Sequence, residues 1–196
     1  MRKTKIVLII MAAAAALASA PFLAAQAPAK AEAPVLVTSC GQSPGPIMLK
    51  VILQKAKIDY ELNTLAAPAD LKTKPYKSLI IVMGASLKGM GAAGISIDDE
   101  LKRVGDLIQE ARKLKIKVIG AHIEGMKRRA QGADAGDTTD EQSIDAVAPK
   151  SDILLINKEG DGDGRFTTIA KAKAIPLLGV EKNLDLVAEL TKLYAK

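Results

Sequence analysis

Three side chains with acid–base or nucleophilic chemistry stand near the predicted ends of β-strands: Cys40, His122 and Glu124. His122 and Glu124 are two positions apart in an extended segment, so they point to the same side and could act as a general base and the group that orients it. Cys40 precedes a predicted helix, and the pKa of a thiol tends to fall at a helix N-terminus. These residues would serve a hydrolase or a transferase. The plainer interpretation of Cys40 is a small packed side chain.

Two loops rich in glycine and hydroxyl groups could instead bind a small ligand. Residues 39–45 (SCGQSPG) and 84–94 (GASLKGMGAAG) each follow a predicted strand. Small residues before a helix allow backbone N–H groups to face an anion, although the first loop could equally be a tight turn capped by Ser43. The second is expected to be a flexible loop that approaches a ligand closely. The candidate contacts are Ser39, Gln42, Ser43, Ser86 and Lys88.

A long polar segment, residues 122–141, could close over such a ligand. Loops of this length in a compact domain are usually functional or disordered. Arg128 and Arg129 are followed by four carboxylates, a mixture that can hold an anion, bind a cation or pair with itself. A solvated surface loop is the alternative interpretation.

The familiar cofactor motifs are incomplete in this chain. Gly89, Gly91 and Gly94 spell G-x-G-x-x-G, but they follow the third predicted strand rather than the first, which argues against dinucleotide binding. Residues 157–168 fit part of a calcium loop, but Thr168 stands where a bidentate glutamate is needed, so an acidic glycine turn is preferred. One histidine and one cysteine fall short of a zinc site. The sequence predicts no metal site and identifies no cofactor.

Short apolar runs alternate with helical patterns along the chain, which predicts an α/β domain with a mostly parallel sheet and helices on both faces, in three layers. The third apolar run (SLIIVMGA) belongs in the centre of the sheet, whereas the half-polar second run suits an edge. The expected strand order is therefore the flavodoxin-like 2-1-3-4-5-6, with a ligand site between strands one and three. Ser96 and Asp99 form an approximate capping box at the start of the second helix. Strands are expected at 34–39, 59–63, 78–85, 117–123, 152–157 and 175–180, and helices at 46–57, 97–114, 141–148, 166–173 and 184–194.

The N-terminal segment is typical of an export signal. Three basic residues precede an apolar run (6–18), and small residues follow, with candidate cleavage sites after Ala20 and Ala27. We expect a periplasmic or extracellular protein without a membrane span in its mature domain; a retained N-terminal anchor is the alternative. The predicted organisation is a signal peptide (1–27), a linker (28–33) and a single α/β domain (34–196).

Charge and composition argue against a nucleic-acid partner. The formal net charge is +6, but three basic residues lie in the N-terminal segment and the remainder is nearly balanced. With no Trp, two Phe and three Tyr, the chain has few aromatic rings on which bases could stack. Its single cysteine cannot form an internal disulfide.

Three segments together resemble a known family: PVLVTSCGQSPG, GASLKGMGAAGISIDDE and HIEGMKRRAQGADAGDTTDEQSIDAVAP. They look like an uncharacterised exported bacterial family, domain of unknown function 6305. The resemblance runs from about Pro34 to the C-terminus, and it implies a bacterial origin and export. It supplies no activity, ligand or catalytic residue.

The sequence therefore favours an exported binding protein for a small polar, anionic ligand at the carboxyl ends of the strands, with Arg128 or Arg129 closing over it. This hypothesis requires the turns after the first and third strands to be neighbours. The alternative is a hydrolase or transferase that uses Cys40, or His122 with Glu124. A third possibility is a module that binds a partner and no small ligand.

Overall fold

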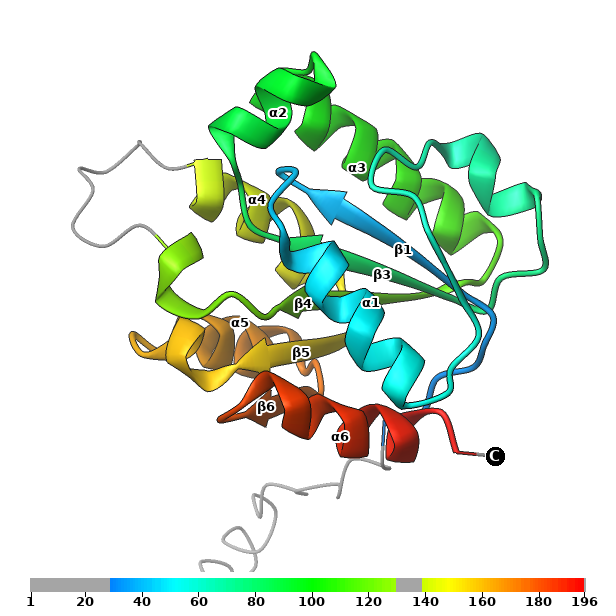
Figure 1. Cartoon of the computed structure of the whole chain (residues 1–196), viewed down its shortest axis with the longest axis vertical. Helices are drawn as coiled ribbons and strands as arrows, with labels where there is room; N and C mark the ends of the chain where they lie inside the picture. Colours follow the sequence, from blue (N-terminus) through cyan, green and yellow to red (C-terminus); the bar gives the residue numbers. More distant parts are fainter. Residues whose placement is uncertain (1–28, 130–138, 196) are drawn as a thin grey trace, which may run out of the picture.

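One all-parallel sheet of six strands organises the molecule (Figure 1). The computed structural model describes residues 29–129 and 139–195, so the predicted signal peptide (1–27) and part of the long polar segment lie outside the described residues. The strand order is β2-β1-β3-β4-β5-β6, which confirms the predicted order. The strands are β1 (Val35–Cys40), β2 (Tyr60–Leu62), β3 (Ser78–Met83), β4 (Lys117–His122), β5 (Ile153–Asn157) and β6 (Leu177–Val180).

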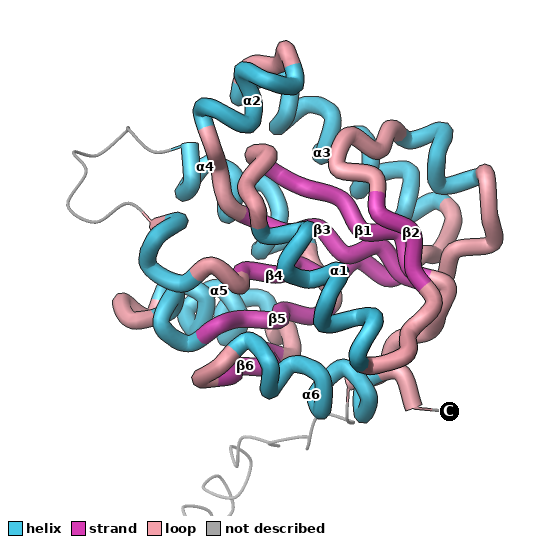
Figure 2. The backbone as a smooth tube through the Cα atoms, viewed as in Figure 1, coloured by secondary structure: helices cyan, strands magenta, loops and turns pink. Residues whose placement is uncertain are grey.

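Helices cover both faces of the sheet and complete three layers (Figure 2). Alternate residues of each strand belong to two separate hydrophobic cores, because successive side chains point to opposite faces of the sheet. Leu36 and Ile81 pack with α3, α4 and α5, whereas Val37 and Val82 pack with α1 and α6. The helices are α1 (Gly45–Lys55), α2 (Leu87–Ala93), α3 (Ile97–Lys113), α4 (Thr139–Val147), α5 (Arg165–Lys173) and α6 (Leu186–Leu193).

The central and edge strands differ in burial as the apolar pattern predicts. Every residue of β3 is buried, whereas β2 is half-buried at the edge. The capping box at the start of α3 is also confirmed. Ser96 Oγ accepts from the Asp99 amide at 3.1 Å, and the Asp99 carboxylate accepts from the Ser96 amide at 3.1 Å.

The segment expected to be a linker packs against the domain where the structure describes it. The Ala31 amide donates to the Leu193 carbonyl at 2.9 Å, and Ala31 is buried. Lys30 Nζ donates to the Ala195 carbonyl at 3.0 Å. The folded unit therefore begins several residues before Pro34, because the chain entering β1 also covers the end of α6.

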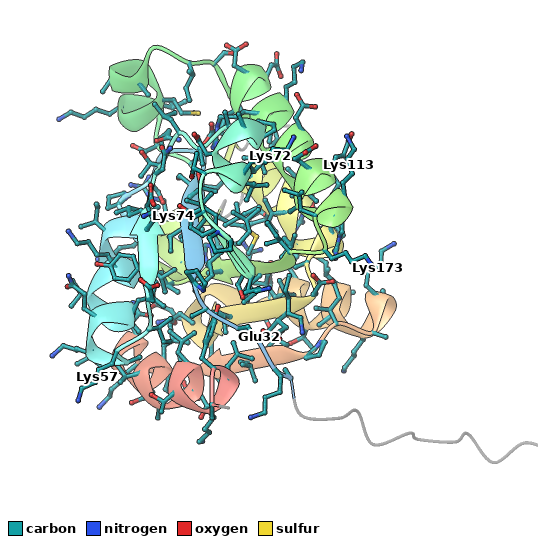
Figure 3. The ribbon with its side chains drawn as sticks, turned by 90° about the vertical axis from the view of Figure 1, so that its right-hand side faces the viewer. Glu32, Lys57, Lys72, Lys74, Lys113 and Lys173 are labelled. Atoms are coloured by element: carbon teal, nitrogen blue, oxygen red, sulfur yellow. The ribbon has the colours of Figure 1, made fainter. Side chains whose placement is uncertain are left out.

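Charged side chains are spread over the face shown in Figure 3, where the labelled lysines come from different elements. Lys57 follows α1, Lys113 lies in α3 and Lys173 lies in α5. Among the residues described, no helix combines the length and the apolar character needed to cross a bilayer.

Candidate functional site

The turns that follow β1 and β3 lie against each other at the carboxyl end of the sheet. The Ser86 amide donates to the Gly41 carbonyl at 2.7 Å, and the Gly84 amide donates to the Cys40 carbonyl at 3.2 Å. Gln42 and Ala85 form an isolated antiparallel bridge. The two turns are therefore neighbours, as the ligand hypothesis requires.

The first of these turns is filled by a carboxylate of the chain itself. Glu100, a fully buried residue of α3, accepts from the Gly41 amide at 2.8 Å and from Gln42 Nε2 at 2.9 Å. Arg103 Nε donates to the same carboxylate at 2.8 Å. Arg103 thus compensates the charge of Glu100. The Gly41 amide, which was expected to face a bound anion, already donates to this carboxylate.

Two further carboxylates accept hydrogen bonds from amides at this end of the sheet. Glu124 Oε2 accepts from the amide of Gly45, the first residue of α1, at 3.1 Å. Asp140 Oδ1 accepts from the Ala85 amide at 2.6 Å, and burial raises the pKa of Asp140. An anion at the switch point would have to displace these carboxylates. The predicted anion site between strands one and three is therefore corrected to an internal network of acidic side chains and amides.

The side chains predicted to contact the anion serve the turns instead. Buried Ser39 accepts from the Gln42 amide at 2.9 Å, and Gln42 Nε2 also donates to the Thr64 carbonyl at 2.9 Å. Ser43 Oγ accepts from the Gly45 amide at 3.3 Å. Their hydrogen bonds shape the strand-to-helix connection, which was the alternative interpretation of this loop.

Most of the glycine-rich segment 84–94 forms helix α2 (Leu87–Ala93) rather than the flexible loop that we expected. Ser86 Oγ accepts from the Gly89 amide at 3.1 Å and caps α2. A Cβ atom at Gly89 would lie 2.1 Å from the Gln42 carbonyl oxygen, and Gly94 ends the helix with φ of 68°. The motif thus reflects helix packing and helix termination. Lys88 is exposed on this helix.

The two arginines of the long segment have separate structural roles. Arg128 Nε donates to Glu124 at 3.3 Å and its Nη1 to the Ala85 carbonyl at 2.9 Å. The Arg129 side chain is 2% exposed, pairs with Glu141 at 2.7 Å, and lies over the Phe166 ring at 5.5 Å. Neither arginine is free to close over a ligand at the switch point without losing these partners.

His122 is buried between two carbonyl groups. Its Nδ1 lies 3.2 Å from the Met83 carbonyl oxygen, and its Nε2 lies 3.0 Å from that of Gly125. Burial lowers its pKa, and its ring centroid is 5.1 Å from that of Phe166. The imidazole is shielded from solvent, and both of its nitrogens face carbonyl oxygens rather than the Glu124 carboxylate, so the predicted base and orienting group are not brought together.

Cys40 is buried on the side of the sheet that faces α4. Its Sγ lies 3.7 Å from the Ser143 carbonyl oxygen. Burial raises the pKa of the thiol, contrary to the expectation from its place before a helix. Cys40 pairs in register with Met83 of β3, and His122 is one strand further. The thiol therefore matches the plainer interpretation, a small packed side chain.

The acidic glycine turn after β5 supports a helix. Asp161 Oδ1 accepts from the Phe166 amide at 2.7 Å, and Asp161 also accepts from the Thr167 amide at 3.2 Å. Asp161, within the partial calcium pattern, thus binds amides in the first turn of α5. Within residues 29–129 and 139–195, no group of three or more His, Cys, Asp or Glu side chains is arranged to hold a metal ion.

A pocket of about 260 Å³ opens at the carboxyl ends of β4, β5 and β6, beside the start of α1. The segments that follow β4 and β5 lie side by side here (Figures 1 and 2). Of the candidate catalytic and ligand-binding residues predicted from the sequence, Glu124 alone lines this pocket. The lining residues are Met48, Ile123, Glu124, Lys127, Asn157, Glu159 and Asn183.

Two asparagines form the polar wall of the pocket. Asn157 Nδ2 donates to Asn183 Oδ1 at 2.9 Å, and Asn183 Nδ2 donates to the Ile123 carbonyl at 2.7 Å. Asn157 Oδ1 accepts from the Glu159 amide at 2.9 Å. Asn157 ends β5 and Asn183 follows shortly after β6, so strand ends were the sequence signal that could have found them.

Comparison with solved structures finds esterases at low similarity. The psychrotrophic esterase EstA from Pseudoalteromonas sp., in a structure inhibited by monoethylphosphonate, is 10% identical, with a TM-score of 0.33, 74% of this chain covered and 76% of that chain. The acetyl xylan esterase AlAXEase is 12% identical, with a TM-score of 0.33 and coverages of 82% and 86%.

Sequence comparison gives a clearer result. No protein with a curated description matches the chain. A family model described as "Domain of unknown function (DUF6305)" matches residues 32–194.

Proposed function

Because this chain belongs to the DUF6305 family, whose description names no activity, we propose its function from the pocket itself: an exported protein that binds a small polar ligand at the carboxyl ends of β4, β5 and β6. Export is part of the proposal, and it is supported by the signal-like sequence of residues 1–27.

The observation that carries the proposal is the contrast between two regions at the same end of the sheet. At the switch point, the chain's own carboxylates occupy the amides of Gly41, Gly45 and Ala85. In the pocket, the Lys127 ammonium and the Glu159 carboxylate have no hydrogen-bond or ion-pair partner among the described residues. Polar groups that converge on a concave site without internal partners are typical of ligand binding.

The size of the pocket limits the ligand. Drug-sized ligands occupy pockets of roughly 300–1,000 Å³, and this one is about 260 Å³. A pocket of this size favours a metabolite of a few heavy atoms over a nucleotide. The hydrolase or transferase alternative retains Glu124 as the one predicted catalytic residue that lines the pocket, since Cys40 and His122 are buried away from it.

Native mass spectrometry of the purified protein tests the proposal through any co-purified small molecule, and a thermal shift screen of small polar metabolites tests it in solution. A binder should raise the melting temperature in a concentration-dependent way, because it stabilises only the folded state. Lys127→Ala should reduce that shift, whereas Lys88→Ala, an equal loss of charge on exposed α2, should not. Absence of any co-purified molecule together with no shift across the screen would reject the proposal.

A further inference from the structure

We infer that the ligand of this pocket is a small zwitterion, which carries an ammonium and a carboxylate group a few atoms apart and an apolar substituent. The inference rests on the proposed function and names the chemical class of the ligand. It follows from the groups that remain available after the chain has satisfied its own hydrogen bonds.

The pocket offers a cation and unused donors to an anionic group. The Lys127 ammonium is exposed and has no partner among the described residues. Each asparagine amide nitrogen carries two hydrogens. Asn157 uses one toward Asn183, and Asn183 uses one toward the Ile123 carbonyl. One hydrogen on each side chain is therefore left for a carboxylate in the pocket.

The pocket also offers an anion to a cationic group. Glu124 is already compensated, since it accepts from the Gly45 amide and from Arg128. Glu159 has no such compensation in the part of the chain that the structure describes, although its amide is held by Asn157. The uncompensated carboxylate of Glu159 favours binding of an ammonium group in the pocket and disfavours binding of a second carboxylate.

A ligand with a single charge would satisfy only half of these groups. A pure anion would be attracted by Lys127 but repelled by Glu159. A pure amine would be attracted by Glu159 but repelled by Lys127. A zwitterion pairs both, and charge-assisted hydrogen bonds are the stronger ones. Met48 and Ile123 supply an apolar part of the lining for its substituent. An α-amino acid with a short aliphatic side chain has this arrangement.

Isothermal titration calorimetry with three matched probes tests the inference: L-valine, 3-methylbutanoate, which lacks the amino group, and 2-methylpropan-1-amine, which lacks the carboxylate. We expect L-valine to bind at least about tenfold more tightly than either analogue, since each loses one charge-assisted contact. Lys127→Ala should remove the preference for L-valine over the amine, and Glu159→Gln the preference over the carboxylate. Lys88→Ala and Glu32→Ala, which alter exposed charges outside the pocket, should leave all three affinities unchanged.

The outcomes separate this inference from the proposed function. Tighter binding of 3-methylbutanoate than of L-valine, strengthened by Glu159→Gln, would overturn the zwitterion and keep a binding protein for anions. Equal affinities of the three probes, insensitive to Lys127→Ala and Glu159→Gln, would also overturn it. If none of the three binds, a thermal shift screen of all twenty amino acids decides: a hit lost in both pocket variants supports the inference, and no hit rejects it.

Discussion

The internal carboxylate Glu100 should be one of the largest single contributors to the stability of this fold. It is fully buried, and it accepts from the Gly41 amide, Gln42 Nε2 and Arg103 Nε. Glu100→Ala would leave the Gly41 amide and one hydrogen of Gln42 Nε2 without an acceptor, and it would remove the counter-charge of the partly buried Arg103. In this variant Arg103 keeps its hydrogen bonds to the Ala66 and Ser39 carbonyls, each at 2.7 Å, and these bonds limit the loss of stability.

The magnitude follows from these contacts. Removing one partner of a buried ion pair costs about 3–5 kcal/mol, and the retained bonds of Arg103 place the expected value near the lower end, about 3 kcal/mol. That is a large share of the roughly 5–15 kcal/mol that stabilise a typical domain. For a domain of this size it corresponds to a fall in melting temperature of roughly 10 °C. Glu100→Gln should cost less, because the amide oxygen can still accept from Gly41.

Urea unfolding at equilibrium, followed by circular dichroism, measures the free energy of unfolding. The matched control is Asp106→Ala, on the same helix, whose carboxylate forms an exposed pair with Lys102 at 2.7 Å. That substitution should change the stability by less than about 0.5 kcal/mol. If Glu100→Ala costs no more than the control, the carboxylate does not hold the turn, and the argument for a filled anion site is wrong.

Three further predictions concern burial and local packing. Burial lowers the pKa of His122 from its ordinary 6.5. Its contribution to stability is therefore full above pH 6.5 and is lost as the pH falls through its folded pKa. His122→Gln should flatten this acid dependence of the free energy of unfolding, by at most about 1.4 kcal/mol per pH unit, in urea titrations between pH 4 and pH 7. Gly160→Ala places a Cβ 2.5 Å from His122 Cδ2 and should destabilise the protein by about 1–3 kcal/mol. Gly91→Ala meets no atom within 4 Å and should stabilise α2 by about 0.5–1 kcal/mol. Equal melting temperatures for the two variants would contradict the packing argument. Cys40 should react with a thiol probe at least roughly a hundredfold more slowly in the folded protein than in denaturant, and rapid labelling of the native protein would show that the thiol is accessible.

Strand order was predictable because it depends on a pattern that is local in the sequence. The fully apolar run of β3 required a central position, and the half-polar β2 required an edge. The turns after β1 and β3 were therefore expected to be neighbours, and the hydrogen bond from Ser86 to Gly41 confirms it.

The content of the site was not predictable in the same way. Glu100 lies 59 positions after the Gly41 amide that it binds, and Asp140 lies 55 positions after the amide of Ala85. No periodicity in the sequence shows which carboxylate will bind which amide. Helix α2 was missed because glycine is a poor helix former. The available signals were Ser86 as a cap and Gly94 as a terminating residue.

The carboxylate of Glu124 at the first turn of α1 also provides a test that can be applied to other sequences of the same fold. A relative with an apolar or small residue at this position would leave the first amide of that helix with only the Ser43 hydroxyl, at 3.3 Å, as its acceptor, and a free phosphate or sulfate could then take the place of the carboxylate. A relative that keeps the acidic side chain would exclude such ions. One aligned position would thus divide the family into members that recruit an external anion and members that carry their own.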